Sequence, residues 1–217
     1  MAREVDIGAH KIMQMDAGKR ERVINAALVE FRNGFGHSST DAIVREAGIS
    51  KGLLYHYFGT KEGLYEFLLF YALDVMRREY FSLLNFGERD VLERLRQMIL
   101  LKWDLSYKHP ALFDFMIAAY AREREDPSDQ FSAVYAEIQS SVAERLFSDI
   151  DTALFREDVD AQKAVNVIQW SLVGYSDSQI SGDKSLEDYQ KDYGVYLAEL
   201  DGYFAMFRKI FYKEVKL

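Results

Sequence analysis

The apolar residues of this sequence recur with the period of an α-helix along nearly its whole length. Apolar stripes run through residues 64–75, 92–105 and 193–211, with the spacings of three and four residues that place side chains on one helix face. Only two prolines, Pro110 and Pro127, interrupt the chain, and proline is the residue that most strongly breaks a helix interior. No hairpin turn between alternating runs is present. The sequence therefore predicts an all-α fold.

The composition narrows the class of protein further. Hydrophobic residues make up 49% of the chain, which is enough for a sizeable buried core. Because cysteine is absent, the chain has neither disulfides nor thiolate metal ligands. No apolar run is long enough for a signal peptide or a membrane span. We therefore expect a cytoplasmic protein.

The charge is distributed unevenly along the chain. Residues 1–63 carry 9 Lys and Arg against 8 Asp and Glu, whereas the remainder carries 18 against 27. An N-terminal segment with almost no net charge, followed by an acidic remainder, fits a protein that contacts nucleic acid with one end only.

Residues 38–58 have the pattern of two short helices joined by a tight turn. Ser38, followed by Asp41, is expected to cap a helix over residues 39–46. Gly48 permits a positive φ in the turn, and Ser50 is expected to cap a second helix through about residue 56. Two short helices around a glycine-bearing turn predict a helix-turn-helix.

The second of these helices carries groups suited to a major groove. Its N-terminus offers backbone N–H groups to phosphate, Lys51 is placed to reach a phosphate or a guanine edge, and Gly52 permits close approach of the backbone. The candidate DNA-binding residues are Ser39, Thr40, Ser50, Lys51, Gly52, Leu53, Tyr55, His56, Tyr57 and Lys61. Alternatives remain for several of them: Tyr55 and Phe58 as core residues, His56 as merely exposed, and Gly52 as a helix-packing residue.

The segments RVINAALVEF, GF and AIVREAGISKGLLYHYFGTKEGL, within residues 17–76, resemble the TetR family of regulators. The resemblance implies a three-helix DNA-binding head with its recognition helix at about residues 50–57 and Lys61 near the phosphates. Glu30 departs from the family pattern, in which a leucine is common. We expect a flexible leader over residues 1–16, the DNA-binding domain over 17–76, and an effector-binding and dimerisation domain over 77–217.

The resemblance also implies an effector pocket inside the C-terminal domain. Large apolar residues with a few polar groups describe such a cavity, although they also describe an ordinary core. An aromatic lining suggests a hydrophobic or planar ligand. The candidate lining residues are Trp103, Tyr107, Phe113, Met116, Tyr120, Asn166, Gln169 and Trp170.

Homodimerisation is expected through two helices near the C-terminus. Residues 186–213 are apolar over a broad arc, and such a helix needs cover on two sides. The family resemblance implies a four-helix interface formed by residues 161–180 and 186–211. The candidate interface residues are Leu172, Tyr175, Tyr196, Leu200, Tyr203 and Phe207.

These features predict a dimeric DNA-binding repressor that a small-molecule effector releases from a palindromic operator. The effector itself is unknown, and no cofactor is expected. A helical ligand-binding or interaction protein that does not bind DNA is the alternative. An enzyme is not expected, because none of the four histidines follows a glutamate by three residues, as the ligands of a di-iron bundle do.

Overall fold

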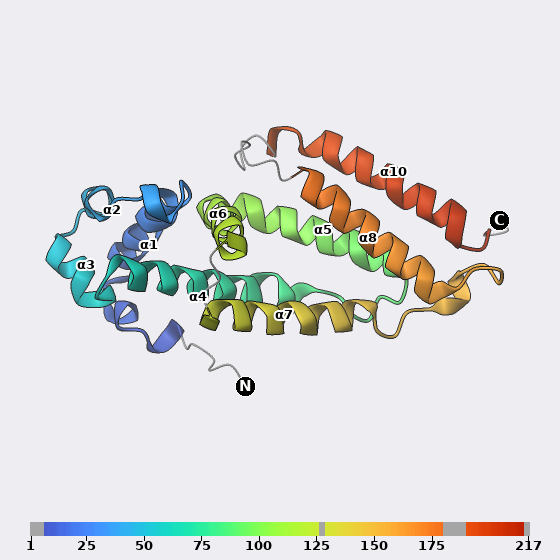
Figure 1. Cartoon of the computed structure of the whole chain (residues 1–217), viewed down its shortest axis with the longest axis horizontal. Coiled ribbons are helices and arrows are strands. Elements are labelled where there is room, and N and C mark those ends of the chain that lie inside the picture. The colour runs from blue at the N-terminus through green and yellow to red at the C-terminus, as the bar shows by residue number, and fades with distance from the viewer. Residues whose placement is uncertain (1–6, 126–128, 180–189, 215–217) are drawn as a thin grey trace. The chain divides into compact units, whose positions relative to one another are not determined.

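The computed structural model describes residues 7–125, 129–179 and 190–214, and these are helical almost throughout. No strand is formed in these ranges, where one isolated bridge joins Phe155 to Tyr212. The all-α prediction is confirmed (Figure 1). The α-helices are α1 (Ala17–Phe31), α2 (Thr40–Ala47), α3 (Lys51–Phe58), α4 (Lys61–Glu79), α5 (Val91–Lys108), α6 (Pro110–Glu125), α7 (Asp129–Phe147), α8 (Ala161–Gln179) and α10 (Tyr193–Phe211).

The chain forms two compact units. The first contains residues 1–83 and 104–140, and the second contains residues 84–103 and 141–217. Helices α5 and α7 each contribute residues to both. The first unit thus includes α6 in addition to the segment predicted to form the DNA-binding domain. In neither unit is a described helix long and apolar enough to cross a lipid bilayer.

The core of the first unit is built around α1, α4 and α6. Phe31 at the end of α1 is 1% exposed, and its ring lies 5.2 Å from that of Tyr65. The Tyr65 ring in turn meets Phe115 of α6 edge-on at 5.5 Å. Edge-on aromatic pairs at such separations are favourable beyond the area they bury. Aromatic packing therefore joins α6 to the helices that support α2 and α3.

Residues before α1 form part of this core. Two short 3-10 helices, Ile7–Ala9 and Lys11–Gln14, bury Ile7 and Ile12, and the His10 ring lies 5.5 Å from Phe58 and 4.6 Å from Phe67. The expectation of a flexible leader is wrong for residues 7–16, because their apolar side chains pack against the core without helical periodicity. The leader's first six residues lie outside the described ones.

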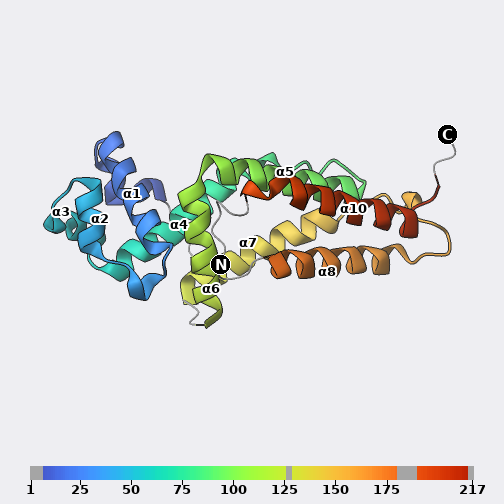
Figure 2. The ribbon, with the colours of Figure 1, turned by 90° about the horizontal axis from the view of Figure 1, so that it is seen from above.

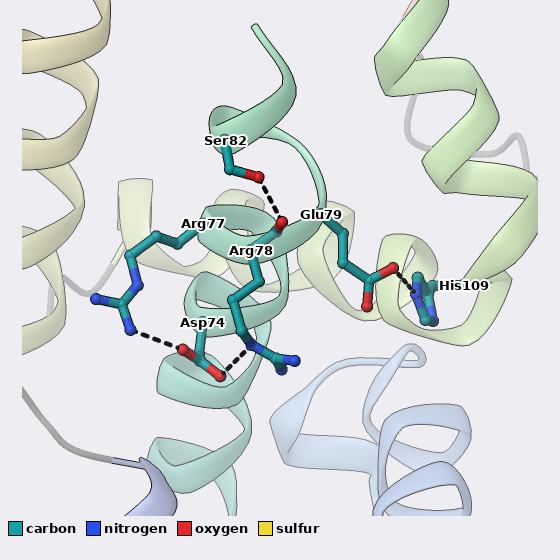
Figure 3. Close-up of polar contacts among 6 residues, drawn as sticks. All are labelled: Asp74, Arg77, Arg78, Glu79, Ser82 and His109. Atoms are coloured by element: carbon teal, nitrogen blue, oxygen red, sulfur yellow. Dashed lines mark hydrogen bonds and ion pairs between the residues drawn. The ribbon is translucent and has the colours of Figure 1, made fainter.

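The end of α4 is held by charged groups (Figure 3). Asp74 forms ion pairs with Arg77 at 3.0 Å and Arg78 at 2.9 Å. Glu79 pairs with Lys108 and, at 3.0 Å, with Nε2 of His109. Hydrogen bonds from Lys108 and His109 lower the pKa of the Glu79 carboxyl. The last turn of α4 is thereby attached to the junction between α5 and α6.

The second unit has its own apolar core. Helices α8 and α10 run side by side (Figure 1, Figure 2), and the first turns of α5 pack with them. The fully buried side chains at the centre of this core are Val91, Leu92, Ile168 and Leu200.

One buried arginine holds together backbone segments of the second unit. Arg94 is 3% exposed, and its guanidinium donates to the carbonyl oxygens of Phe86, Glu88, Arg145, Leu146 and Ser148 at 2.6–3.2 Å. The last carbonyls of a helix lack intrahelical partners. Arg94 therefore ends α7 and fixes the segment that precedes α5.

We predict that the stability of the first unit falls in mild acid because of His10. Burial, with a smaller contribution from Lys11, lowers the pKa of His10 below 6.5. The unfolded chain therefore binds a proton more readily than the folded chain, and stability decreases as pH falls below 6.5. Since His10 is only partly buried, the loss should stay below about 1 kcal/mol.

Chemical denaturation at about pH 7.5 and about pH 5.5 measures this loss. His10→Phe, which retains a ring between Phe58 and Phe67, should show a smaller difference between the two pH values than the wild type. An equal difference in both proteins would show that His10 does not contribute.

Candidate nucleic-acid interface

Helix α2 begins at a polar junction with α1. Ser39 is its N-cap, and its Oγ accepts a hydrogen bond from the Ala42 N–H at 3.4 Å. The Ser39 N–H donates to Oε1 of Glu30 at 2.8 Å. Glu30, which stands where a leucine is common in the family pattern, thus accepts a hydrogen bond from a backbone N–H at the start of α2.

The prediction that Ser38 caps α2 is wrong by one residue. A 3-10 turn, Phe35–His37, precedes α2, and Ser38 closes that turn by donating from Oγ to the Phe35 carbonyl at 2.8 Å. The added turn moves the cap to the next hydroxyl-bearing residue, Ser39.

The turn and the second helix form as predicted. Gly48 ends α2 with φ 66°, and Ser50 caps α3 by accepting from the Leu53 N–H at 3.2 Å. Helix α3 continues to Phe58, two residues beyond its predicted end. The predicted helix-turn-helix is therefore present in the structure.

The side chains of α3 divide into a buried and an exposed set. Leu54 and Phe58 are 1% and 8% exposed, which confirms the core role considered for Phe58. Lys51, Gly52 and His56 are exposed. The remaining candidates on this helix, Leu53, Tyr55 and Tyr57, are half-buried. An exposed strip thus runs along α3 from its N-terminus.

A hydrogen bond joins Tyr55 to the first turn of α2, and a ring contact joins Tyr57 to His56. The Tyr55 hydroxyl lies 3.2 Å from Oγ1 of Thr40, which is 9% exposed. Tyr57 meets the His56 ring edge-on at 5.1 Å.

A Cβ added at Gly52 would meet no atom within 4 Å, so helix packing does not require the glycine there.

Lys51 is paired with an acid on the neighbouring helix. Its Nζ lies 2.8 Å from Oδ1 of Asp41, in the first turn of α2, and both side chains are exposed. The hydrogen bond to Asp41 raises the pKa of Lys51. The free protein therefore presents an ion pair, rather than an isolated cation, at the start of α3.

Lys61 is held by the protein itself. Its Nζ donates to the carbonyl oxygens of Phe35 and Ser38, both at 2.6 Å, and lies 4.5 Å from the centroid of the Phe35 ring. Sequence reasoning assigned this ammonium to phosphate. In the structure it fixes the segment that leads into α2.

The predicted pocket residues are distributed over both units. In the first, Phe113 is 7% exposed and Met116 is partly buried, whereas Tyr107 and Tyr120 are 49% and 45% exposed. In the second, Trp103 packs on Tyr193 and Tyr196, and Asn166 and Gln169 are half-buried.

Trp170 does not line an enclosed cavity of the second unit. It is 68% exposed, because it lies on the side of α8 opposite the buried Ile168. A shallow cleft of about 280 Å³ does lie beside α5 and α10, and none of the eight predicted pocket residues lines it. Its lining residues are Leu92, Glu93, Arg96, Asp201, Phe204, Ala205 and Arg208.

Two of the predicted dimer residues face the core of their own unit. Leu200 and Phe207 are each 2% exposed and belong to the core of their own unit, so they are not available to a partner. Tyr175 stacks on Tyr196 at 5.4 Å and contacts Tyr203 at 5.2 Å. Leu172, like these tyrosines, is half-buried.

Other apolar side chains are exposed on the same two helices, and sequence reasoning did not assign them to the dimer interface. Three lie on α8 and three on α10, each 41–72% exposed. The signal that identifies them is the register of each helix, that is, which of its positions face the solvent. This register can be assigned only once the buried face of the helix is known. These residues are Val167, Trp170, Val173, Val195, Met206 and Ile210.

Part of the chain matches the model of a known protein family. Residues 23–68 match the model for bacterial regulatory proteins of the tetR family. The transcriptional regulator BetI of Pectobacterium atrosepticum is 31% identical over 111 residues, which cover 50% of this chain and 57% of BetI. The nucleoid occlusion factor SlmA of Vibrio vulnificus is 22% identical over 182 residues, covering 80% of this chain and 92% of SlmA.

Solved structures share the fold. The ketosteroid transcriptional regulator KstR2 of Mycobacterium tuberculosis superposes with a TM-score of 0.59 at 22% identity, covering 93% of this chain and 98% of KstR2. A TetR family regulator of Chloroflexus aurantiacus gives 0.57 at 18% identity, covering 94% and 97%. The likeness to these structures thus extends beyond the residues that the family model matches.

We predict that Lys61 stabilises the fold. Lys61→Met would leave two backbone carbonyls without their donor, and hydrogen bonds to charged groups contribute about 1.5–3 kcal/mol each. The free energy of unfolding should fall by about 2–3 kcal/mol. Chemical denaturation measures it.

Lys51→Met is the matched control, because it removes an exposed lysine of the same region and should change stability little. If both variants unfold like the wild type, Lys61 does not fix the segment before α2.

Proposed function

This chain belongs to the tetR family of bacterial regulatory proteins, and we propose that it binds a palindromic operator as a homodimer that a small-molecule effector releases. Members of the family are DNA-binding transcriptional regulators rather than enzymes. The observation that carries the proposal is the exposed strip of α3, where Lys51, Gly52 and His56 follow a capped N-terminus within the matched region.

The chemistry of this strip suits a major groove. The N-terminus of α3 presents backbone N–H groups and the positive end of the helix dipole, which favour a phosphate oxygen. Lys51 can reach a phosphate or a guanine edge, and His56 and Tyr57 add donors along the same helix. Within the head, residues 7–16 complete the core beneath α3.

Asp41 is expected to tune this contact. In the free protein it pairs with Lys51 at 2.8 Å, and an incoming phosphate must compete for the same ammonium. Its charge also repels the DNA backbone. Asp41 should therefore weaken binding to DNA in general, so that favourable base contacts are needed for tight binding.

We predict opposite effects for the two members of this pair. Lys51→Met should weaken operator binding and reduce the slope of log affinity against log salt by about one contact. Asp41→Asn should raise affinity for unrelated DNA more than for the operator. Fluorescence anisotropy over a salt series measures both, using DNA from upstream of the protein's own gene and a scrambled duplex.

If the wild type binds the upstream and scrambled duplexes equally, that result favours the alternative function, a helical ligand-binding or interaction protein. An unchanged salt slope in Lys51→Met would remove Lys51 from the interface.

A homodimer is supported by the exposed apolar residues of α8 and α10. Val167, Trp170 and Val173 lie on α8, and Met206 and Ile210 lie on α10. Exposed apolar residues gathered on neighbouring helices mark interaction surfaces. A twofold partner covering them would supply a second α3, and two such helices about 34 Å apart fit successive major grooves.

We predict that Trp170→Glu dissociates the dimer. Tryptophans at the centre of an interface commonly contribute 2 kcal/mol or more, so the dissociation constant should rise about 30-fold or more. Sedimentation equilibrium measures it. Leu83→Glu is the control, since Leu83 is 59% exposed outside α8 and α10. Equal dissociation constants for the two variants would exclude Trp170 from the interface.

The remaining elements of the proposal follow from DNA binding. A bacterial DNA-binding regulator acts in the cytoplasm, where the chromosome lies. We assign residues 17–76 to DNA binding and residues 77–217 to effector binding and dimerisation. The attachment of α6 to α1, through the aromatic contacts and the Arg32–Asp114 ion pair at 3.8 Å, supports transmission of an effector signal to the head. Release requires that the effector bind one state more tightly than the other.

A further inference from the structure

Phe35 begins the 3-10 turn that leads into α2, and both its backbone and its ring are held by neighbours. Its carbonyl oxygen accepts hydrogen bonds from Nζ of Lys61 at 2.6 Å and from Oγ of Ser38 at 2.8 Å. Its ring lies parallel to that of Phe31 at 5.9 Å and meets that of Tyr65 edge-on at 5.2 Å. Because the turn leads directly into the cap of α2, the position of Phe35 helps to determine where α2 begins.

Arg122 of α6 contacts the same ring. The Cζ atom of its guanidinium lies 4.1 Å from the centroid of the Phe35 ring and 4.8 Å from that of the Tyr65 ring. A guanidinium over the face of an aromatic ring is attracted by the quadrupole of the ring. Nζ of Lys61 lies 4.5 Å from the centroid of the Phe35 ring. One cation from α4 and one from α6 therefore share the ring that precedes α2.

The guanidinium of Arg122 holds this position at an energetic cost. Its Nη1 atom is buried and has no hydrogen-bond partner among the described residues, although the side chain as a whole is half-buried. A buried donor without a partner destabilises the folded state. The side chain therefore contributes less to stability than its ring contacts alone would. A polar group that is kept in place at such a cost is a candidate for a functional role.

We propose that Arg122 is a positioning residue for DNA binding, because it holds the Phe35 ring and, through that residue, the entry to α2. The inference rests on the proposed function, in which α2 and α3 together present the surface that contacts DNA. Arg122 itself belongs to α6, which lies outside the residues that the family model matches. A change in the position of α6 can therefore reach α2 through Phe35 without passing through α3 or α4.

Native-state hydrogen exchange tests whether Arg122 holds the entry to α2. The amides that close this entry are those of Ser39 and Ile43, whose acceptors lie 2.8 Å and 3.1 Å away. In Arg122→Met both should exchange about fivefold faster, because a segment that is held less firmly opens more often. The amide of Leu64, in the first turn of α4, should exchange as in the wild type.

Operator binding tests whether this position matters for DNA. Arg122→Met should weaken binding to the upstream duplex about fivefold, since substitutions that act through a positioning contact change a coupled affinity by about this factor. Binding to the scrambled duplex and the slope of log affinity against log salt should not change, because the proposal gives Arg122 no phosphate contact. Thermal unfolding should stay close to that of the wild type, because the variant loses the unpaired N–H together with the ring contacts.

Further variants show whether the effect passes through the Phe35 ring. Arg122→Lys keeps the charge and should lose less operator affinity than Arg122→Met, and Phe35→Tyr keeps the ring and should behave like the wild type. In Phe35→Leu, adding Arg122→Met should have no further effect, because substitutions that act through one contact are not additive. Arg32→Met is the matched control. It removes an arginine that joins α1 to Asp114 of α6 at 3.8 Å rather than to Phe35, and should leave exchange at Ser39 unchanged.

The proposal is overturned if Arg122→Met leaves the exchange of Ser39 and Ile43 unchanged, or if it weakens binding to both duplexes equally. It is also overturned if Arg32→Met has the same effects as Arg122→Met. If the wild type does not prefer the upstream duplex while Arg122→Met still accelerates exchange at the entry to α2, the proposed function fails and the hold of Arg122 on Phe35 stands.

Discussion

One ammonium group fixes the segment on which the helix-turn-helix depends. Lys61 donates to the carbonyls of Phe35 and Ser38, and Ser39 immediately afterwards caps α2. Glu30 accepts the Ser39 N–H, so a cation from α4 and an anion from α1 hold the two ends of the peptide group that joins Ser38 to Ser39. Because α2 begins at this junction and α3 follows α2 after the three residues 48–50, the placement of the exposed strip of α3 follows from it.

The second unit uses the same chemistry with a different residue. Arg94 binds carbonyl oxygens with its guanidinium and ends α7, as Lys61 fixes the entry to α2. In each unit a cation thus satisfies backbone carbonyl oxygens.

Local signals allowed the sequence to predict the turn and the second helix of the helix-turn-helix. Gly48 and Ser50 act through their own backbone and nearest neighbours, so their roles were readable without the fold. The cap of α2 was misplaced because a 3-10 turn adds a residue that no periodicity reveals, and the packing of residues 7–16 was missed for the same reason. Leu200 was assigned to the dimer because an apolar arc as broad as that of α10 does not indicate which side meets the core.

Gly52 has an implication that concerns the surroundings of the molecule rather than its interior. Glycine inside a helix costs about 1 kcal/mol relative to alanine, and here neither steric crowding nor backbone geometry compensates for that cost. Gly63 is different, since a Cβ there would lie 2.3 Å from the Phe58 carbonyl oxygen. The fold thus accounts for Gly63 and does not account for Gly52; the DNA contact proposed for α3 would give Gly52 a role, because a methyl group there would hold an approaching surface away.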